Sequence, residues 1–174
     1  MDTKIRIDDD VLIIDDDNDF DFLLEEILHD AGCVTYVCTT LSEAEKQIRD
    51  ERFDVVILDL AFPDESPDRA AGLEFAQKAK AQRPDIGIIV VSNNTEKDIL
   101  LKAINIGVDK FLPKTTSPKE LIDVVAATAE VAKEKEFQKI LIEVFAKLGD
   151  AYDQAQSAME EVTLILKESQ AHGV

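Results

Sequence analysis

The chain has 174 residues, 45% of them hydrophobic and 32% charged, with a formal net charge of −18. This composition is typical of a folded protein with a real core, and the negative charge argues against nucleic-acid binding, which requires clustered Lys and Arg. No apolar run approaches the roughly 20 residues of a membrane helix, and the first ten residues lack a signal-peptide core, so we expect a cytoplasmic protein with no membrane contact.

Short β-rich runs alternate with helical patterns from Val11 to about Thr115. The predicted strands cover residues 11–14, 33–38, 54–60, 86–92 and 109–113. The predicted helices between them cover residues 20–30, 41–52, 71–82 and 95–106. Five strands alternating with helices predict a doubly wound α/β domain with a parallel sheet. The third and fourth strands are apolar without alternation, as in central strands covered on both faces.

Two features of the N-terminal half carry smaller predictions. Cys33 and Cys38 are an odd number of residues apart, so a strand would place them on opposite faces, unable to form a disulfide. The acids Asp8 to Asp10 precede the first strand, at the opposite end from Asp15, and are predicted to form a solvated turn.

The region after Lys114 contains no β-rich run and is predicted to be helical. Ser117, Pro118 and Glu120 form a helix start, with a cap, a proline at the first position and an acid three residues after the cap. Apolar or small residues then alternate at spacings of three and four, the pattern of a coiled coil: Leu141, Val144, Leu148, Ala151, Ala155, Ala158, Val162 and Ile165. Gly149 either breaks this region into a hairpin or lies within one long helix, which we favour.

Polar residues follow the predicted strands where their carboxyl ends meet at one sheet edge. The first strand is followed by Asp15, Asp16 and Asp17. The third delivers Asp59, the fourth Ser92 and the fifth Lys114. Several carboxylates in one place repel unless a cation joins them, and hard oxygen ligands suit Mg²⁺. Such an edge can receive a phosphoryl group, with a carboxylate such as Asp59 as the nucleophile.

These segments together resemble the receiver domain of two-component response regulators. The resemblance rests on "VLIIDDDNDF", "VVILDL", "IIVVSNN" and "DKFLPK", in this order, and covers about Val11 to Ala127. It implies a flavodoxin-like sheet of strand order 2-1-3-4-5, a receiver over residues 1–127 and a helical extension, coiled coil or hairpin, over residues 128–174.

The resemblance also implies a role for each site residue. Asp59 is the phosphoacceptor, and Mg²⁺ is held by Asp15, Asp16, Asp59 and the backbone carbonyl of Ala61. Ser92 and Lys114 bind the phosphoryl group, and Phe111 follows Ser92 as the switch aromatic. Ala61 and Asn94 occupy the two positions that tune dephosphorylation. The loop from residue 60 to residue 72 is longer and more acidic than usual, and is a candidate lid or partner-selecting segment.

We therefore predict a phosphorylation-switched response regulator rather than an enzyme, since transfer to Asp59 and its hydrolysis are self-catalysed. The implied partners are a histidine kinase or phosphotransfer protein, and a second copy bound through the C-terminal helices or the face of the fourth helix, fifth strand and fifth helix. The alternatives are a stand-alone receiver, acting as a phosphorelay intermediate or phosphate sink, and a Mg²⁺-dependent phosphohydrolase with an Asp nucleophile. Ala61 counts against the phosphohydrolase, because haloacid-dehalogenase-type enzymes have a second Asp at that position.

Overall fold

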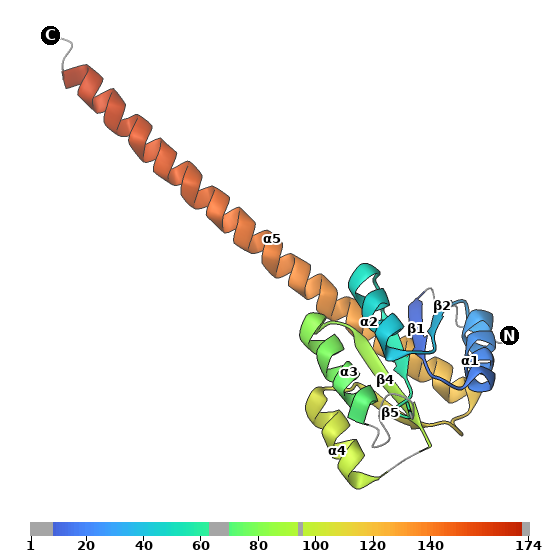
Figure 1. Cartoon of the computed structure of the whole chain (residues 1–174). Coiled ribbons are helices and arrows are strands. Elements are labelled where there is room, and N and C mark those ends of the chain that lie inside the picture. The colour runs from blue at the N-terminus through green and yellow to red at the C-terminus, as the bar shows by residue number, and fades with distance from the viewer. Residues whose placement is uncertain (1–8, 63–69, 94–95, 172–174) are drawn as a thin grey trace. The chain divides into compact units, whose positions relative to one another are not determined.

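The structure, a computed structural model, describes residues 9–62, 70–93 and 96–171. The strands are β1 (Asp10–Ile14), β2 (Val34–Cys38), β3 (Val55–Leu58), β4 (Gly87–Ser92) and β5 (Lys110–Pro113). The helices are α1 (Asn18–Ala31), α2 (Leu41–Asp50), α3 (Ala70–Gln82), α4 (Lys97–Ile106) and α5 (Pro118–Ala171). All the predicted strands and helices of the α/β region are therefore present, with ends that differ by a few residues (Figure 1).

The five strands form one sheet of order β2-β1-β3-β4-β5, in which all neighbours are parallel. This confirms the flavodoxin-like order that the family resemblance implied. In the register, Val11 lies between Thr35 of β2 and Val55 of β3. Because β1 and β3 are neighbours near the middle of the sheet, the residues that follow them emerge side by side.

The sheet separates two layers of helices and two apolar clusters. Helices α2, α3 and α4 cover one face, packing on residues such as Leu12 and Val56, and α1 with the first part of α5 covers the other (Figure 1). β3 and β4 are buried along their whole length, as expected for central strands. Cys38 belongs to the first cluster and Cys33 to the second, so the two thiols are on opposite faces and both are free, as predicted.

Polar caps and glycines set the ends of helices around this sheet. The Asp17 side chain caps α1 by accepting hydrogen bonds from the backbone N–H groups of Asp19 and Phe20. The helix ends at Gly32, whose φ of 103° is left-handed and suits glycine. Asp17 is thus committed to the helix start, immediately beside the acidic pair that precedes it.

The prediction of a solvated turn before β1 is wrong for Asp9. Its side chain is buried and forms an ion pair with Lys133 of α5. The same ammonium lies 3.7 Å from Asp54, whose carboxylate also accepts a hydrogen bond from the Asp10 backbone N–H. Lys133 is 123 residues or more from Asp9 and Asp10 in sequence, so the pattern near β1 held no sign of it. Asp10 itself is exposed, and Asp8 lies outside the described residues.

We expect Lys133→Met to destabilise the receiver by about 1–2 kcal/mol, because it leaves the buried Asp9 carboxylate without its cation. The Lys133 ammonium is half-exposed, which keeps the effect below that of a fully buried pair. Chemical denaturation of the parent and of the variant measures the change. Lys139→Met, on an exposed part of α5, is the matched control and should leave the unfolding midpoint unchanged.

Helix α5 belongs to two compact units, one of residues up to Glu134 and one from Lys135 onward. Thr128, Ala129 and Ala132 are buried, so the receiver's packing continues past residue 127, where the sequence placed the boundary. The helix is continuous through Gly149, as favoured, and not a hairpin. Within the described ranges, no helix combines the length and apolarity needed to cross a bilayer.

Candidate phosphoryl-acceptor site

The predicted site residues converge where the carboxyl ends of the parallel strands meet. Asp15 and Asp16 directly follow β1, Asp59 follows β3, Ser92 ends β4 and Lys114 follows β5. Sheet-like hydrogen bonding continues past β3, since the Asp59 backbone N–H donates to Ile14 at 2.9 Å. This contact fixes Asp59 beside the end of β1, where the acidic pair begins.

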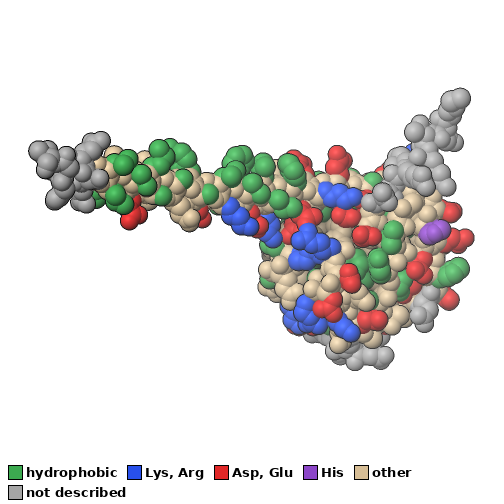
Figure 2. All heavy atoms as spheres, turned by 90° about the horizontal axis from the view of Figure 1, so that it is seen from above, with side chains coloured by type: hydrophobic (Ala, Val, Ile, Leu, Met, Phe, Trp, Pro, Cys, Tyr) green, Lys and Arg blue, Asp and Glu red, His purple; other side chains and the backbone are tan. Residues whose placement is uncertain are grey.

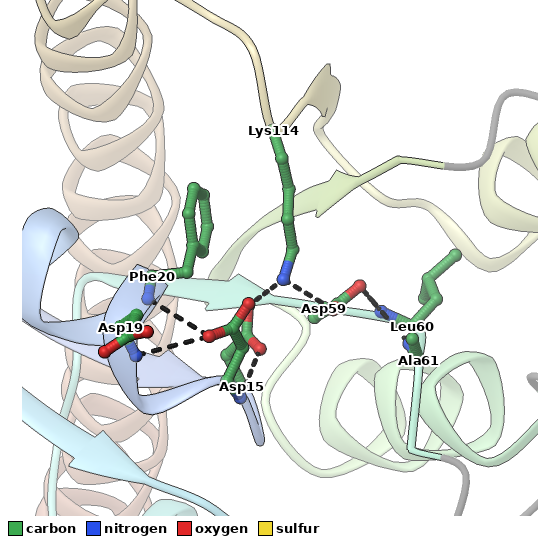
Figure 3. A network of polar contacts seen from close by, with 8 residues as sticks. Asp15, Asp19, Phe20, Asp59, Leu60, Ala61 and Lys114 are labelled. Atoms are coloured by element: carbon green, nitrogen blue, oxygen red, sulfur yellow. Dashed lines mark hydrogen bonds and ion pairs between the residues drawn. The ribbon is translucent and has the colours of Figure 1, made fainter.

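The ammonium group of Lys114 joins two of the carboxylates. Its Nζ lies 2.7 Å from Asp15 Oδ2 and 2.9 Å from Asp59 Oδ2 (Figure 3). All three side chains are nearly buried, with the Lys114 side chain 11% exposed and the carboxylates less. The same Nζ lies 4.4 Å from the centre of the Phe20 ring, a cation–π contact. The lysine is therefore held in place from three sides.

The second oxygen of Asp59 is held by the backbone that follows it. Asp59 Oδ1 accepts hydrogen bonds from the N–H groups of Leu60, at 2.6 Å, and Ala61, at 3.2 Å (Figure 3). Asp15 Oδ1 likewise accepts a hydrogen bond from the Asp17 N–H at 2.9 Å. Each buried carboxylate thus has one oxygen on backbone donors and the other on Lys114, which fixes the orientation of both.

The electrostatics of the site place one buried cation among several acids. Burial raises the pKa of Asp15 above its ordinary value, against the lowering effect of its hydrogen bonds with Lys114 and Asp17, and the Asp59 carboxylate adds to the rise. Burial acts to lower the pKa of Lys114, but hydrogen bonds to Asp15 and Asp59 outweigh it, so that pKa is raised. Negative charge is therefore in excess, and a further cation would relieve it.

The donors fit a small, hard divalent cation. Asp15, Asp16 and Asp59 each offer a carboxylate oxygen, and these three oxygens lie within 4.8 Å of one another. Asp16 is exposed while the other two are buried, which leaves one side of the cluster open to solvent. An all-oxygen set with room for water ligands suits Mg²⁺.

The residues predicted to act as the switch occupy the neighbouring strands. Ser92 is 2% exposed at the end of β4, and Phe111 of β5 is half-buried against the apolar cluster that α2, α3 and α4 cover. The backbone N–H of Ala61 donates a hydrogen bond to the Asp59 carboxylate. Asn94, predicted to tune dephosphorylation, and residues 63–69 of the long loop lie outside the described residues.

Two residues of this region were not predicted from the sequence. Phe20 contacts the Lys114 ammonium, and its place in the first turn of a helix that follows an acidic pair was the available signal. Asp21 is buried, and neither of its oxygens has a hydrogen-bond partner. Burial, with a further contribution from the Asp15 carboxylate, raises its pKa to about 7.

Asp21 makes stability depend on pH. A carboxyl whose pKa is about 7 when folded and 3.8 otherwise favours the folded state fully below pH 4, and this contribution is lost as pH rises to about 7. We expect Asp21→Asn to remove that loss, so that the variant gains about 2–4 kcal/mol relative to the parent between pH 4 and pH 8. Urea denaturation at both pH values measures the difference. An equal effect of the substitution at both pH values would contradict it.

With the site described, comparison with known proteins identifies the family. The response regulator receiver domain family matches residues 11–126, and the chain belongs to it. The DNA-binding transcriptional regulator NtrC of Azospirillum brasilense is 31% identical over 115 residues, covering 66% of this chain and 23% of its own. A CheY-like receiver domain structure from Methanospirillum hungatei superposes with a TM-score of 0.67 at 23% identity, covering 74% of this chain and 99% of that one.

A third similarity is to NtrX of Brucella abortus, with a TM-score of 0.68 at 27% identity, covering 78% of this chain and 30% of that one. The chain spans less than half the length of curated relatives such as NtrC, of which it covers 23%, and the regulator PhoB of Pseudomonas aeruginosa, of which it covers 48%. The activities of those whole proteins are therefore not assigned to this chain.

Proposed function

We propose that this chain is a response regulator that accepts a phosphoryl group on Asp59 from a histidine kinase or phosphotransfer protein. A carboxylate oxygen of Asp59 attacks the phosphorus of a phosphohistidine, the new P–O bond forming as the P–N bond breaks, and water later hydrolyses the acyl phosphate. The observation that carries the proposal is the arrangement of Asp59 beside Asp15, with Lys114 within 3 Å of both.

The surrounding residues have separate parts in this reaction. Asp15, Asp16, Asp59 and the Ala61 carbonyl would hold Mg²⁺, which when bound neutralises charge on the phosphoryl oxygens. The Lys114 ammonium, which pairs with Asp59, then also pairs with a phosphoryl oxygen. The Ser92 hydroxyl donates a hydrogen bond to a second phosphoryl oxygen. Ser92 and Phe111 lie on adjacent strands, so movement of the hydroxyl toward the phosphoryl group gives the Phe111 ring space to follow.

The output is proposed to run through protein contacts of α5 or of the face formed by α4, β5 and α5. From Thr115 to Val174 the sequence has 11 acids, 6 lysines and no arginine, which disfavours contact with DNA phosphates by this segment. The apolar seam of the tail favours pairing with a second copy. A stand-alone receiver that only relays phosphoryl groups is the second candidate, favoured by a family match that covers only the receiver region, residues 11–126.

Phosphorylation by acetyl phosphate with Mg²⁺ tests the proposal. We expect stoichiometric, acid-stable and alkali-labile labelling of the parent chain, and at least a hundredfold less for Asp59→Asn, because the carboxamide of asparagine lacks the carboxylate oxygen that would form the acyl phosphate. Phosphate-affinity electrophoresis measures the labelled fraction. Asp30→Asn, an exposed acid at the end of α1, is the matched control and should label normally. Undiminished labelling of Asp59→Asn would reject the assignment.

A further inference from the structure

The tail of α5 carries an apolar face that is exposed among the described residues of the chain. From Phe137 to Lys167 every side chain is exposed, and Figure 2 shows hydrophobic side chains along much of this helix. Phe145, Tyr152 and Met159 are 64%, 69% and 72% exposed. An isolated helix derives little stability from propensity alone, so a face of this kind requires a partner.

Heptad positions define three rows on this face. The seam occupies positions a and d: Leu141, Val144, Leu148, Ala151, Ala155, Ala158, Val162 and Ile165. Position e is apolar in every heptad: Phe145, Tyr152, Met159 and Leu166. Position g, on the other side of the seam, is occupied by Lys147, Gln154, Glu161 and Glu168. One flank of the seam is thus apolar, and the other is polar and carries charges of both signs.

We infer that the tail pairs with the tail of a second copy in the antiparallel direction, centred near residues 153 and 154. The inference rests on the tail association of the proposed function and adds its direction and register. Its first support is charge. In an antiparallel pair g faces g, so Lys147 of each copy faces Glu161 of the other and Gln154 faces its own copy. A parallel pair places g beside e, and sets Lys147 against Tyr152 and Glu161 against Leu166.

The seam supports the same register independently. Antiparallel packing opposes a and d, so Leu141 meets Ile165, Val144 meets Val162 and Leu148 meets Ala158. Only the two central layers, in each of which Ala151 of one copy meets Ala155 of the other, then have a small side chain from both helices. A parallel pair would stack three consecutive layers of Ala against Ala, leaving a long underpacked stretch.

The apolar flank is consistent with this arrangement too. Antiparallel pairing brings e to e, so Tyr152 meets its own copy and Phe145 meets Met159.

Charge exchange tests the direction, using the full chain at low salt without phosphorylation. Lys147→Glu and Glu161→Lys should each weaken self-association about tenfold, because each places like charges opposite one another twice per pair. An equimolar mixture of the two variants should associate as tightly as the parent, because each mixed pair has opposite charges at both places. Glu160→Lys, with the same charge change on the outer face, is the control and should associate like the parent. Sedimentation equilibrium measures the dissociation constants.

Cross-linking with a bismaleimide of about 10 Å reach tests the register. Gln154→Cys should cross-link to its own copy. Val162→Cys should not, because the two copies of residue 162 lie about 27 Å apart along the axis, but it should cross-link to Val144→Cys in a mixture. The parent chain, with buried Cys33 and Cys38, controls for the native thiols.

The outcomes separate this inference from the function on which it rests. Self-cross-linking of Val162→Cys, or failure of the mixed charge variants to recover affinity, would overturn the antiparallel arrangement while leaving a dimer. A monomeric parent would overturn both the pairing and the dimeric output. Neither result bears on phosphorylation of Asp59, which its own labelling experiment decides.

Discussion

Lys114→Met is expected to lower the free energy of unfolding by about 3 kcal/mol at pH 7.5 without Mg²⁺, the cost of removing one partner from a buried ion pair. The methionine retains most of the apolar stem, so the loss reflects charge. It leaves the Asp15 and Asp59 carboxylates, 3% and 4% exposed, repelling each other with no cation between them. Urea denaturation of the parent and the variant measures the difference.

The loss should be recoverable in two ways that a packing defect would not allow. Mg²⁺ should raise the melting temperature of Lys114→Met by more than that of the parent, because the cluster without its lysine is more negative. Adding Asp59→Asn to Lys114→Met should restore part of the stability by removing one of the repelling charges. Lys102→Met, on the exposed side of α4, is the control, and its unfolding should not respond to Mg²⁺ more than that of the parent. A loss that neither treatment reduces would show that Lys114 acts through packing.

The fold and the site edge were predictable from sequence because both depend on local signals with a fixed geometry. Apolar runs such as residues 55–58 and 87–92 identify buried parallel strands, and a parallel sheet gathers the residues that follow its strands at one edge. Asp15, Asp59 and Lys114 follow three different strands, so their convergence required only that the strands be parallel. Their order in the sheet came from the family resemblance, since periodicity does not encode which strands are neighbours.

What the sequence did not reveal depends on contacts between distant segments. Asp9 resembled any acid before a strand, yet it is buried because α5 brings Lys133 against it. Asp21 followed the pattern of an exposed first-turn acid but is buried without a hydrogen bond. Both cases follow from tertiary packing, which decides whether a charged side chain near a helix or strand end meets solvent, a partner or neither.

The two ends of the sheet therefore carry related arrangements of charge. At the carboxyl end Lys114 joins Asp15 to Asp59, and at the amino end Lys133 pairs with Asp9 near Asp54. Lys114 precedes α5 and Lys133 lies within it, so both lysines belong to the segment that runs from the end of β5 into α5. A phosphoryl group that draws Lys114 from Asp15 or Asp59 would act directly at the start of this segment.

Gly72→Ala is expected to destabilise the receiver by about 2–3 kcal/mol and to slow phosphorylation of Asp59. Gly72 lies in the first turn of α3, where an added Cβ would come within 2.9 Å of Leu60 Cα and 3.1 Å of the Asp59 carbonyl oxygen. Both are backbone atoms, so no side chain can turn away to relieve the contact. The helix or the strand end must shift, and the strand end carries Asp59, the proposed phosphoacceptor. Thermal unfolding and the rate of labelling by acetyl phosphate measure the two effects.

Gly149→Ala provides the contrast, since a Cβ there meets nothing within 4 Å and the residue lies inside α5. We expect this substitution to strengthen the tail helix by about 1 kcal/mol, the ordinary gain of Ala over Gly in a helix, with higher ellipticity at 222 nm and unchanged phosphorylation. If Gly72→Ala unfolded and labelled like the parent, the close approach of α3 to the end of β3 would not constrain the site. If Gly149→Ala lowered the helix content, the glycine would have a conformational role in the tail that a continuous helix does not explain.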